Sequence, residues 1–261
     1  MGNQIRAVFL DIDGTLVHQG RLVPSAEKAV RLLRQNDIYV ALCTGRAQLH
    51  TRQIQHRLEL PDAVYFNGGL TVQGEDVVKS NPLSPEVVQR IRDFSFANEL
   101  PAIFHSRKDA LVFTDIPSQL SSLLEEYQFP ALNHVSSELW QAQTEDVYQA
   151  NVFMAKTWDV PVQNHLPECL LYRWDDTAVD LQRRGCDKSV GALALLERLG
   201  ISTSEAVHIG DGGNDVGMFQ NMGMSVAMGN APREVQHQAQ MLTDRVQDDG
   251  VYHALKRLKL I

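Results

Sequence analysis

Two aspartates separated by one residue follow a short apolar run near the N-terminus. Residues 6–10 (RAVFL) lead into Asp11, Ile12 and Asp13, and Gly14 comes next. Two such carboxylates at a strand end project from one edge of a sheet: one can attack phosphorus while the other handles the leaving-group proton. Gly14 allows the backbone to turn sharply away. The pair predicts a phosphate or metal site with a candidate nucleophile.

A calcium-binding loop is an alternative for this acidic stretch. An EF-hand loop needs glycine at its sixth position and glutamate at its twelfth. Counting from Asp11, glycine is fourth and the twelfth position is Leu22, and the preceding run is typical of a strand. An acidic turn without chemistry stays open for this motif alone.

Thr44, Gly45 and Arg46 follow a second apolar run, residues 38–43. A hydroxyl and backbone amides at the start of a helix can hold a phosphate group. A threonine that only caps the helix explains the same residues, so this motif alone does not decide between the two interpretations.

Lys188 is expected at the start of a helix over residues 188–199. A lysine there opposes the helix macrodipole, so its position needs a reason, and holding a phosphoryl group beside Asp11 would be one. A solvated surface lysine is the other interpretation.

A glycine-rich loop with two further carboxylates follows the apolar run 206–209. The loop reads GDGGND and contains Asp211, Asn214 and Asp215. Mg²⁺ prefers oxygen ligands and keeps several waters, so the loop predicts a magnesium site. A simple turn explains the glycines but not the two acids with an asparagine between them.

The four motifs come at the ends of expected strands or at the starts of expected helices. Apolar runs predict strands, and helical periodicity predicts the helices between them. Strands separated by helices of this length indicate βαβ units and a parallel sheet. We therefore predict an α/β fold with a doubly wound, Rossmann-like parallel sheet, whose ligands bind beyond the carboxyl ends of the strands.

Residues 84–183 follow a different pattern, because their strands come in adjacent pairs. Runs at 102–105 and 111–114, and at 170–174 and 178–181, are joined by short polar turns. Such spacing favours hairpins and an antiparallel sheet. We predict a core domain made of residues 1–83 and 184–261, with an inserted α+β domain over residues 84–183.

The composition argues against several classes of protein. Of the 261 residues, 44% are hydrophobic and 21% charged, as in ordinary globular proteins. The three cysteines are scattered, which argues against zinc and disulfide frameworks. A net charge of −8 argues against a nucleic-acid-binding surface. Because no apolar run could span a bilayer and no secretory h-region precedes Asp11, we expect a cytoplasmic protein without a membrane partner.

In their order along the chain, these motifs resemble the haloacid dehalogenase superfamily of phosphatases, and within it the Cof-type group with a C2-type (IIB) cap. The resemblance covers both ends of the chain, and residues 84–183 match the cap only in length and pattern. The matching stretches are VFLDIDGTL (8–16), ALCTGR (41–46), YFNGG (65–69), DKSVGALALLERLGI (187–201), VHIGDGGNDVGMF (207–219), VAMGNA (226–231) and DDGVYHAL (248–255).

The resemblance implies the catalytic roles. Asp11 would be the nucleophile that forms a phospho-enzyme. Asp13 would protonate the leaving group and then activate water. Thr44 and Lys188 would hold the phosphoryl oxygens.

The resemblance also implies the surrounding contacts. The amides of Ile12 and Gly45 would lie beside the phosphoryl group, and Asn214 would contact the phosphate or orient the lysine. Mg²⁺ would be the cofactor, held by Asp11, Asp13 (through its backbone carbonyl), Asp211 and Asp215, the last either directly or through water. His18 and Arg46 receive no role and are interpreted as structural or solvent-facing.

The predicted function is a Mg²⁺-dependent phosphatase acting on small phosphorylated metabolites. Sugar phosphates are the leading substrates, followed by nucleotides and by pyridoxal or flavin phosphates. In the family the cap closes over the site and selects the leaving group. Polar residues of the insert that could reach a substrate are His105, Arg107, Lys108, Arg173 and Trp174. The sequence does not indicate an oligomeric state.

Three other functions remain as alternatives. A signalling receiver domain also accepts phosphate on aspartate, but it would place its acceptor after the acidic cluster and would lack the second metal loop and the insert. A phosphomutase or other phosphotransferase would use Asp11 and Asp13 to pass the phosphate to a second hydroxyl. A catalytically weak, phosphate-binding regulator would be expected to have lost Asp11, Asp13 or Asp211, and all three are present.

Overall fold

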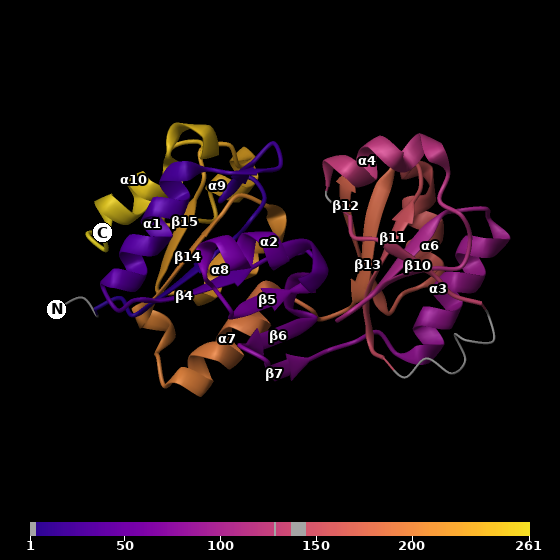
Figure 1. The fold of residues 1–261 in the computed structure, drawn as a ribbon, viewed down its shortest axis with the longest axis horizontal. Coiled ribbons are helices and arrows are strands. Elements are labelled where there is room, and N and C mark those ends of the chain that lie inside the picture. Colours follow the sequence, from indigo (N-terminus) through magenta and orange to yellow (C-terminus); the bar gives the residue numbers. More distant parts are fainter. Residues whose placement is uncertain (1–3, 128, 137–144) are drawn as a thin grey trace. The chain divides into compact units, whose positions relative to one another are not determined.

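The computed structural model describes residues 4–127, 129–136 and 145–261 (Figure 1). The chain divides into two compact units. The core unit comprises Met1–Arg46, Arg52–Ser80 and Asp187–Ile261, and the inserted unit comprises Ala47–Thr51 and Asn81–Cys186. Of the predicted insert 84–183, residues 128 and 137–144 lie outside the described residues.

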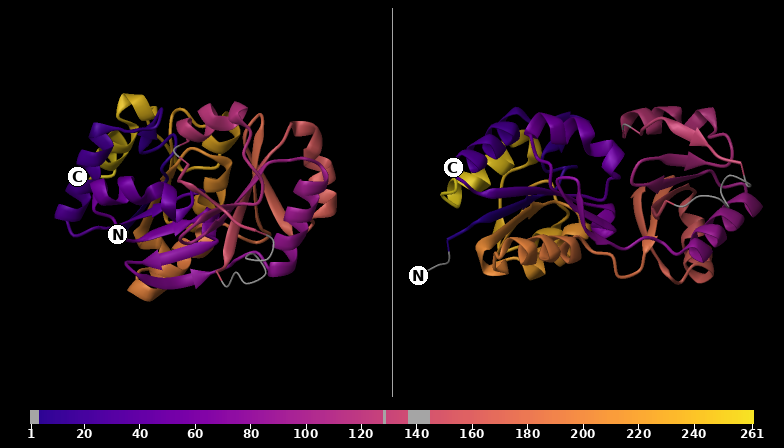
Figure 2. Two further views of the ribbon diagram at one scale, coloured as in Figure 1. Left: turned by 45° about the vertical axis from the view of Figure 1, so that its right-hand side comes forward. Right: turned by 60° about the horizontal axis from the view of Figure 1, so that its bottom comes forward.

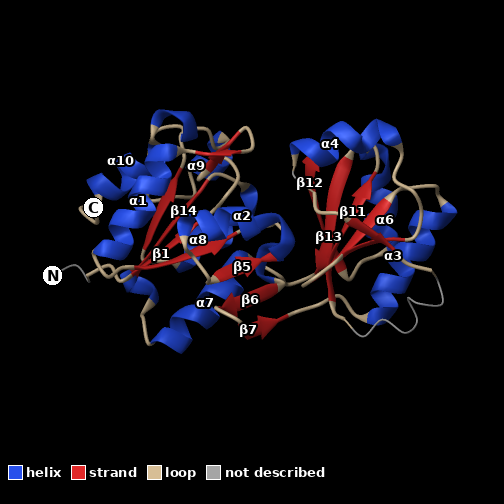
Figure 3. Ribbon diagram, viewed as in Figure 1, coloured by secondary structure: helices blue, strands red, loops and turns tan. Residues whose placement is uncertain are grey.

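Outside Asn81–Cys186 the chain forms the following strands and α-helices (Figure 3). The strands are β1 Ala7–Leu10, β2 Val17–His18, β3 Arg21–Leu22, β4 Tyr39–Cys43, β5 Ala63–Tyr65, β6 Leu70–Gln73, β7 Asp76–Ser80, β14 Ala206–Gly210, β15 Met224–Ala227 and β16 Met241–Leu242. The α-helices are α1 Pro24–Gln35, α2 Gln48–Leu58, α7 Lys188–Leu199, α8 Val216–Asn221, α9 Arg233–Gln236 and α10 Gly250–Arg257.

The main sheet of the core unit has the strand order β16-β15-β14-β1-β4-β5-β6-β7. From β16 to β5 all neighbours are parallel, which confirms the predicted α/β fold. An antiparallel hairpin, β6–β7, extends the sheet at one edge and was not predicted. Its two-residue turn contains Gly74 at φ +59°, a left-handed conformation that glycine adopts readily.

Helices cover both faces of this sheet, so its central strands have little contact with water. All four residues of β1 are buried, as expected of a parallel strand covered on both sides. In Figure 2, α1 and α10 lie over one face, and α7 and α8 lie over the other. On the second face Phe9 packs with Leu195 of α7 and Met218 of α8.

The parallel register brings the ends of three strands to one edge of the sheet. Leu10, the last residue of β1, pairs with Leu42 of β4 and Ile209 of β14. The segments that follow these strands therefore leave the sheet at the same edge. These segments carry three of the four predicted motifs.

The inserted unit contains a second, mostly antiparallel sheet in the order β10-β9-β8-β11-β13-β12. Both predicted hairpins, β8–β9 and β12–β13, are confirmed, whereas the fully buried central strand β11 was missed. The strands are β8 Ala102–Ser106, β9 Ala110–Val112, β10 Leu132–His134, β11 Val147–Phe153, β12 Cys169–Asp175 and β13 Ala178–Arg183; the helices are α3 Pro85–Ala97, α4 Ser121–Glu126 and α6 Asp159–His165. Among the helices of the described residues, none has both the length and the apolar character needed to cross a membrane.

Candidate active site

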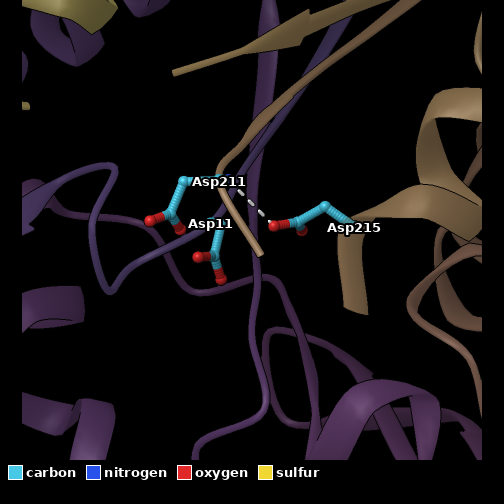
Figure 4. Close-up of side chains that lie close together, drawn as sticks. All are labelled: Asp11, Asp211 and Asp215. Carbon is cyan, nitrogen blue, oxygen red and sulfur yellow. Dashed lines mark hydrogen bonds between the residues drawn. The ribbon is translucent and has the colours of Figure 1, made fainter. Parts of the chain in front are cut away.

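Three carboxylates meet beyond the ends of β1 and β14. Asp11 follows β1, whereas Asp211 and Asp215 lie on the loop after β14. One oxygen of each carboxylate lies within 4.8 Å of the other two (Figure 4). The adjacent parallel pairing of the two strands produces this cluster, because Asp11 and Asp211 emerge from neighbouring positions at the same edge.

Lys188 lies between two of these carboxylates, those of Asp11 and Asp215. It is the first residue of α7 and has no exposed surface. Its Nζ lies 2.8 Å from Asp11 Oδ1 and 2.7 Å from Asp215 Oδ1. The alternative interpretation as a solvated surface lysine is therefore wrong. The carboxylate of Asp187 caps the helix by accepting a hydrogen bond from Ser189 N at 2.8 Å, which fixes where Lys188 begins the helix.

Burial and the neighbouring charges shift the pKa values of Lys188 and of the carboxylates around it. Burial lowers the pKa of Lys188, but the charges of Asp11 and Asp215 outweigh burial and raise it, so the lysine stays protonated. Burial raises the pKa of Asp11, and Asp215 and Asp211 raise it further, although Lys188 opposes them. Burial also raises the pKa of Asp211 to about 7, with a second contribution from the charge of Asp215.

Asp215 differs from the other two carboxylates because protein donors surround it. Its Oδ1 contacts Lys188 Nζ and, at 2.8 Å, His208 Nε2. Its Oδ2 accepts hydrogen bonds from the backbone amides of Asp211 at 3.1 Å and Gly212 at 2.9 Å. Burial opposes ionisation, yet Lys188 and His208 outweigh it and hold the pKa of Asp215 below its usual value. Asp215 is thus an ionised carboxylate with two donors at each oxygen.

Asp211 is tied to the loop after β15 and to the turn after β1. Its Oδ2 accepts a hydrogen bond of 2.8 Å from Asn230 Nδ2, which also donates to the carbonyl of Gly14 at 2.9 Å. Gly14 has φ +68°, and a Cβ atom there would lie 2.0 Å from Asp211 Oδ2. Only glycine therefore lets the turn approach this carboxylate.

The side chain of Asp13 does not join the cluster of three carboxylates. Both of its oxygens accept hydrogen bonds from Arg46, which is 11% exposed at its side chain. Of the two interpretations left for Arg46, solvent-facing is therefore wrong, whereas a structural role fits this contact. The sequence did contain a signal for this contact. Arg46 directly follows Thr44 and Gly45, and the strand before them was expected to end at the same edge of the sheet as the strand before Asp13.

Asn67 connects the segment Thr44–Gly45, which follows β4, with the loop after β14. Thr44 is buried, and its Oγ1 accepts a hydrogen bond of 3.1 Å from Arg46 N. A Cβ atom on Gly45 would lie 3.1 Å from Asn67 Oδ1, and that oxygen accepts a hydrogen bond of 2.9 Å from Asn214 Nδ2. The predicted residues Gly45 and Asn214 thus both lie next to the side-chain oxygen of Asn67.

Asn67 was missed as a site residue, although it belongs to the quoted stretch YFNGG. Phe66 and Asn67 have φ values of +51° and +48°, in the left-handed region that non-glycine residues rarely adopt. Such strain persists where the surrounding structure enforces it, often at functional sites. Gly68 follows at φ +93°, where a Cβ atom would lie 2.1 Å from the carbonyl oxygen of Asp187.

The remaining predicted residues have structural surroundings of their own. Ile12 is fully buried, and its carbonyl accepts hydrogen bonds from the amides of the turn that follows, such as Val17 N at 2.8 Å. Arg173 pairs with Asp159. His105 is fully buried within the inserted unit, where burial lowers its pKa to about 4. Neither Arg173 nor His105 therefore presents a free charge.

Comparison with known proteins shows the family to which the chain belongs. A family model described as haloacid dehalogenase-like hydrolase matches residues 8–255. A phosphoglycolate phosphatase of Archaeoglobus fulgidus is 27% identical over 262 residues, which cover 98% of each chain. A hypothetical protein of Geobacillus kaustophilus has a solved structure with 32% identity and a TM-score of 0.89, covering 98% of this chain and 100% of that one. A solved sugar phosphatase of HAD subclass IIB has 26% identity and a TM-score of 0.86, with coverage of 98% and 100%.

Proposed function

Because the chain belongs to the haloacid dehalogenase-like hydrolases, we propose that it is a phosphoric monoester hydrolase that forms an aspartyl-phosphate on Asp11. The observation that carries this proposal is the buried contact of Lys188 Nζ with Asp11 Oδ1, at 2.8 Å. A fully buried lysine beside a carboxylate at a strand end provides a nucleophile and a phosphate-binding cation together.

The reaction proceeds in two displacements. In the first, an oxygen of Asp11 attacks phosphorus, the ester P–O bond breaks, and Asp13 gives its proton to the departing alkoxide. In the second, water attacks the phosphorus of the aspartyl-phosphate and Asp13 takes up a proton from that water. The P–O bond to Asp11 breaks, so that inorganic phosphate leaves and the Asp11 carboxylate is regenerated. Lys188 neutralises charge on the phosphoryl oxygens in both steps.

The residues present fit a Mg²⁺ ion. The three clustered carboxylates are hard oxygen donors. Burial, and after it the charges of neighbouring carboxylates, raises the pKa values of Asp11 and Asp211, and a bound cation would offset both effects. Asp11, Asp211 and the backbone carbonyl of Asp13 would hold the ion. Asp215 would act indirectly, because four protein donors already occupy its oxygens. When bound, the ion would favour the ionised form of Asp11 and screen its repulsion from an anionic substrate.

The phosphoryl group would also be held by neutral donors. Thr44 would offer its hydroxyl, and Ile12 and Gly45 would offer their backbone amides. Asn214 would complete this set, oriented by its hydrogen bond to Asn67. Sugar phosphates are the substrate class we propose, supported by the similarity to the HAD subclass IIB sugar phosphatase.

Replacement of the nucleophile tests the proposal. Asp11→Asn should abolish release of phosphate from p-nitrophenyl phosphate and from a panel of sugar phosphates in the presence of MgCl₂. Asp62→Asn is the matched control, since Asp62 is also a buried aspartate of the core unit but binds Tyr39 and the Gly74 amide instead. Near-normal turnover by Asp11→Asn would overturn the assignment.

The intermediate can be trapped separately. Asp13→Asn should slow the second displacement, so that p-nitrophenyl phosphate leaves a phosphoryl group on the peptide that contains Asp11. Mass spectrometry of the acid-quenched protein would detect it. A phosphotransferase would instead convert an added sugar into a second phosphorylated product, with less phosphate released than ester consumed.

A further inference from the structure

His208 is a buried residue of β14 to which neither the motifs nor the proposed reaction assigns a role. It has no exposed surface, and it pairs with Phe9 across the parallel ladder of β14 and β1. Its Nδ1 lies 3.1 Å from the carbonyl oxygen of Phe9, and its Nε2 lies 2.8 Å from Asp215 Oδ1. The ring thus connects the strand that carries Asp11 with the carboxylate that binds Lys188.

The contact with Asp215 has a defined direction. Both oxygens of Asp215 accept hydrogen bonds from Lys188 and from the amides of Asp211 and Gly212, as those of a carboxylate do, so Nε2 of His208 is the donor in its contact with Asp215. Buried hydrogen bonds to an ionised group are stronger than neutral ones, and they orient the group that accepts them. His208 therefore restrains the carboxylate of Asp215 from within the sheet.

That restraint extends to the nucleophile through Lys188. The oxygen of Asp215 that binds His208 also binds Lys188 Nζ, which in turn contacts Asp11 Oδ1. The other oxygen of Asp215 is held by the amides of Asp211 and Gly212. Without His208, Lys188 would be the one remaining donor to Asp215 Oδ1 among these contacts. The Asp215 carboxylate and the Lys188 ammonium group could then move together, away from their positions beside Asp11.

We propose that His208 is a positioning residue of this site, which holds Asp215 and thereby sets the position of Lys188 beside Asp11. The inference rests on the proposed function. It extends the proposed function by one residue, His208, which contacts the reacting groups only through Asp215 and Lys188. The loop bearing Asp211 is positioned by the same carboxylate, so the effect includes the proposed ion site.

Three substitutions separate the two contacts of the ring. His208→Leu removes both. The terminal amide of glutamine can reach the place of Nε2, so His208→Gln retains a donor for Asp215, whereas the shorter His208→Asn retains a donor only near Nδ1. Loss of partners that orient metal ligands lowers activity or metal affinity roughly 10–100-fold. We expect kcat for p-nitrophenyl phosphate to fall by that factor in His208→Leu and His208→Asn, with KM little changed, and to recover in His208→Gln.

Thermal unfolding gives a second readout that needs no turnover. MgCl₂ should raise the unfolding midpoint of the wild-type chain, and His208→Leu should need roughly tenfold more MgCl₂ for half of this effect. Phe219→Leu is the structural control, because Phe219 packs on the His208 ring at 5.7 Å between centroids. It should lower the midpoint while keeping the wild-type kcat and MgCl₂ response.

Two results would overturn the inference. One is equal kcat and equal MgCl₂ response in His208→Gln and His208→Asn, a comparison that holds even if His208→Leu does not fold. The other is a Phe219→Leu variant that reproduces the loss seen in His208→Asn. Either result would overturn the role of His208 alone. The proposed function would still hold if the wild type were active and Asp11→Asn inactive.

Discussion

Arg46 holds both carboxylate oxygens of Asp13. Its Nε lies 2.7 Å from Oδ2 and its Nη2 lies 2.6 Å from Oδ1. A guanidinium that binds a carboxylate through two parallel hydrogen bonds fixes the plane of that carboxylate. The acid and base that we propose for the reaction is therefore oriented by a residue from the loop after the neighbouring strand β4.

Arg46→Ala should slow the hydrolysis of alkyl phosphates more than that of p-nitrophenyl phosphate. General acid catalysis contributes roughly 10²–10⁴-fold where a leaving group needs a proton, and nitrophenolate leaves with little need for one. We expect kcat for an alkyl phosphate to fall roughly tenfold or more. Arg46→Lys keeps the charge without the two parallel bonds and should give an intermediate value. Equal losses for both kinds of ester would contradict the orienting role.

Lys188→Met should destabilise the core unit as well as stop the reaction. The substitution leaves the buried carboxylates of Asp11 and Asp215 without their shared cation. Breaking a buried ion pair by removing one partner lowers the free energy of unfolding by roughly 3–5 kcal/mol. Urea denaturation without MgCl₂ would measure this, and adding Asp215→Asn to Lys188→Met should restore part of the loss. A change within about 0.5 kcal/mol, as at ordinary surface sites, would show that the pair contributes little.

Asp211→Asn should have opposite effects with and without metal. The pKa of Asp211 is raised to about 7 by burial and by Asp215, so at alkaline pH its charge is unfavourable in the metal-free protein. We expect the variant to unfold at a higher temperature than the wild type without MgCl₂, and to lose most of the stabilisation that MgCl₂ provides. A thermal scan with and without the salt measures both effects. Asp62→Asn should keep the wild-type response, and an undiminished response in Asp211→Asn would remove this residue from the ion site.

The stability of the inserted unit should depend on the ionisation of Asp180. Burial raises the pKa of this carboxyl from 3.8 to about 7, although hydrogen bonds from Gln149, Trp174 and Asn151 oppose the rise. Because the unfolded chain loses the proton at lower pH than the folded chain, the contribution of Asp180 to stability is full below about pH 4 and is lost as pH rises through about 7.

Asp180→Asn removes this titration. A shift of three pKa units corresponds to roughly 4 kcal/mol, so the variant should gain up to that amount relative to the wild type between about pH 4 and pH 8. Urea unfolding followed by tryptophan fluorescence is suited to this measurement, because Trp174 Nε1 donates to Asp180 Oδ1 at 2.7 Å. A constant difference between the two proteins across this range would contradict the prediction.

The sequence by itself determined the α/β core, the two hairpins of the insert and the positions of the motifs along the chain. Apolar periodicity indicates which apolar residues are buried, and the burial of β1 and of the apolar residues of α7 follows from this local pattern. The unpredicted elements have weaker local signals. The hairpin β6–β7 depends on the turn at Gly74, and β11 carries polar residues such as Gln149 and Asn151 that its neighbours in the sheet bury.

Tertiary structure alone decided which polar groups meet. Lys188 could be interpreted as a surface residue until the fold placed it between Asp11 and Asp215, and Arg46 had no partner until Asp13 faced it. Asn67 and His208 likewise contact residues distant in sequence, Asn214 and Phe9 respectively. The physical reason is that hydrophobic periodicity is a local property of the chain. Hydrogen bonds between side chains instead depend on strand order and register, which bring the ends of β1, β4 and β14 to one edge.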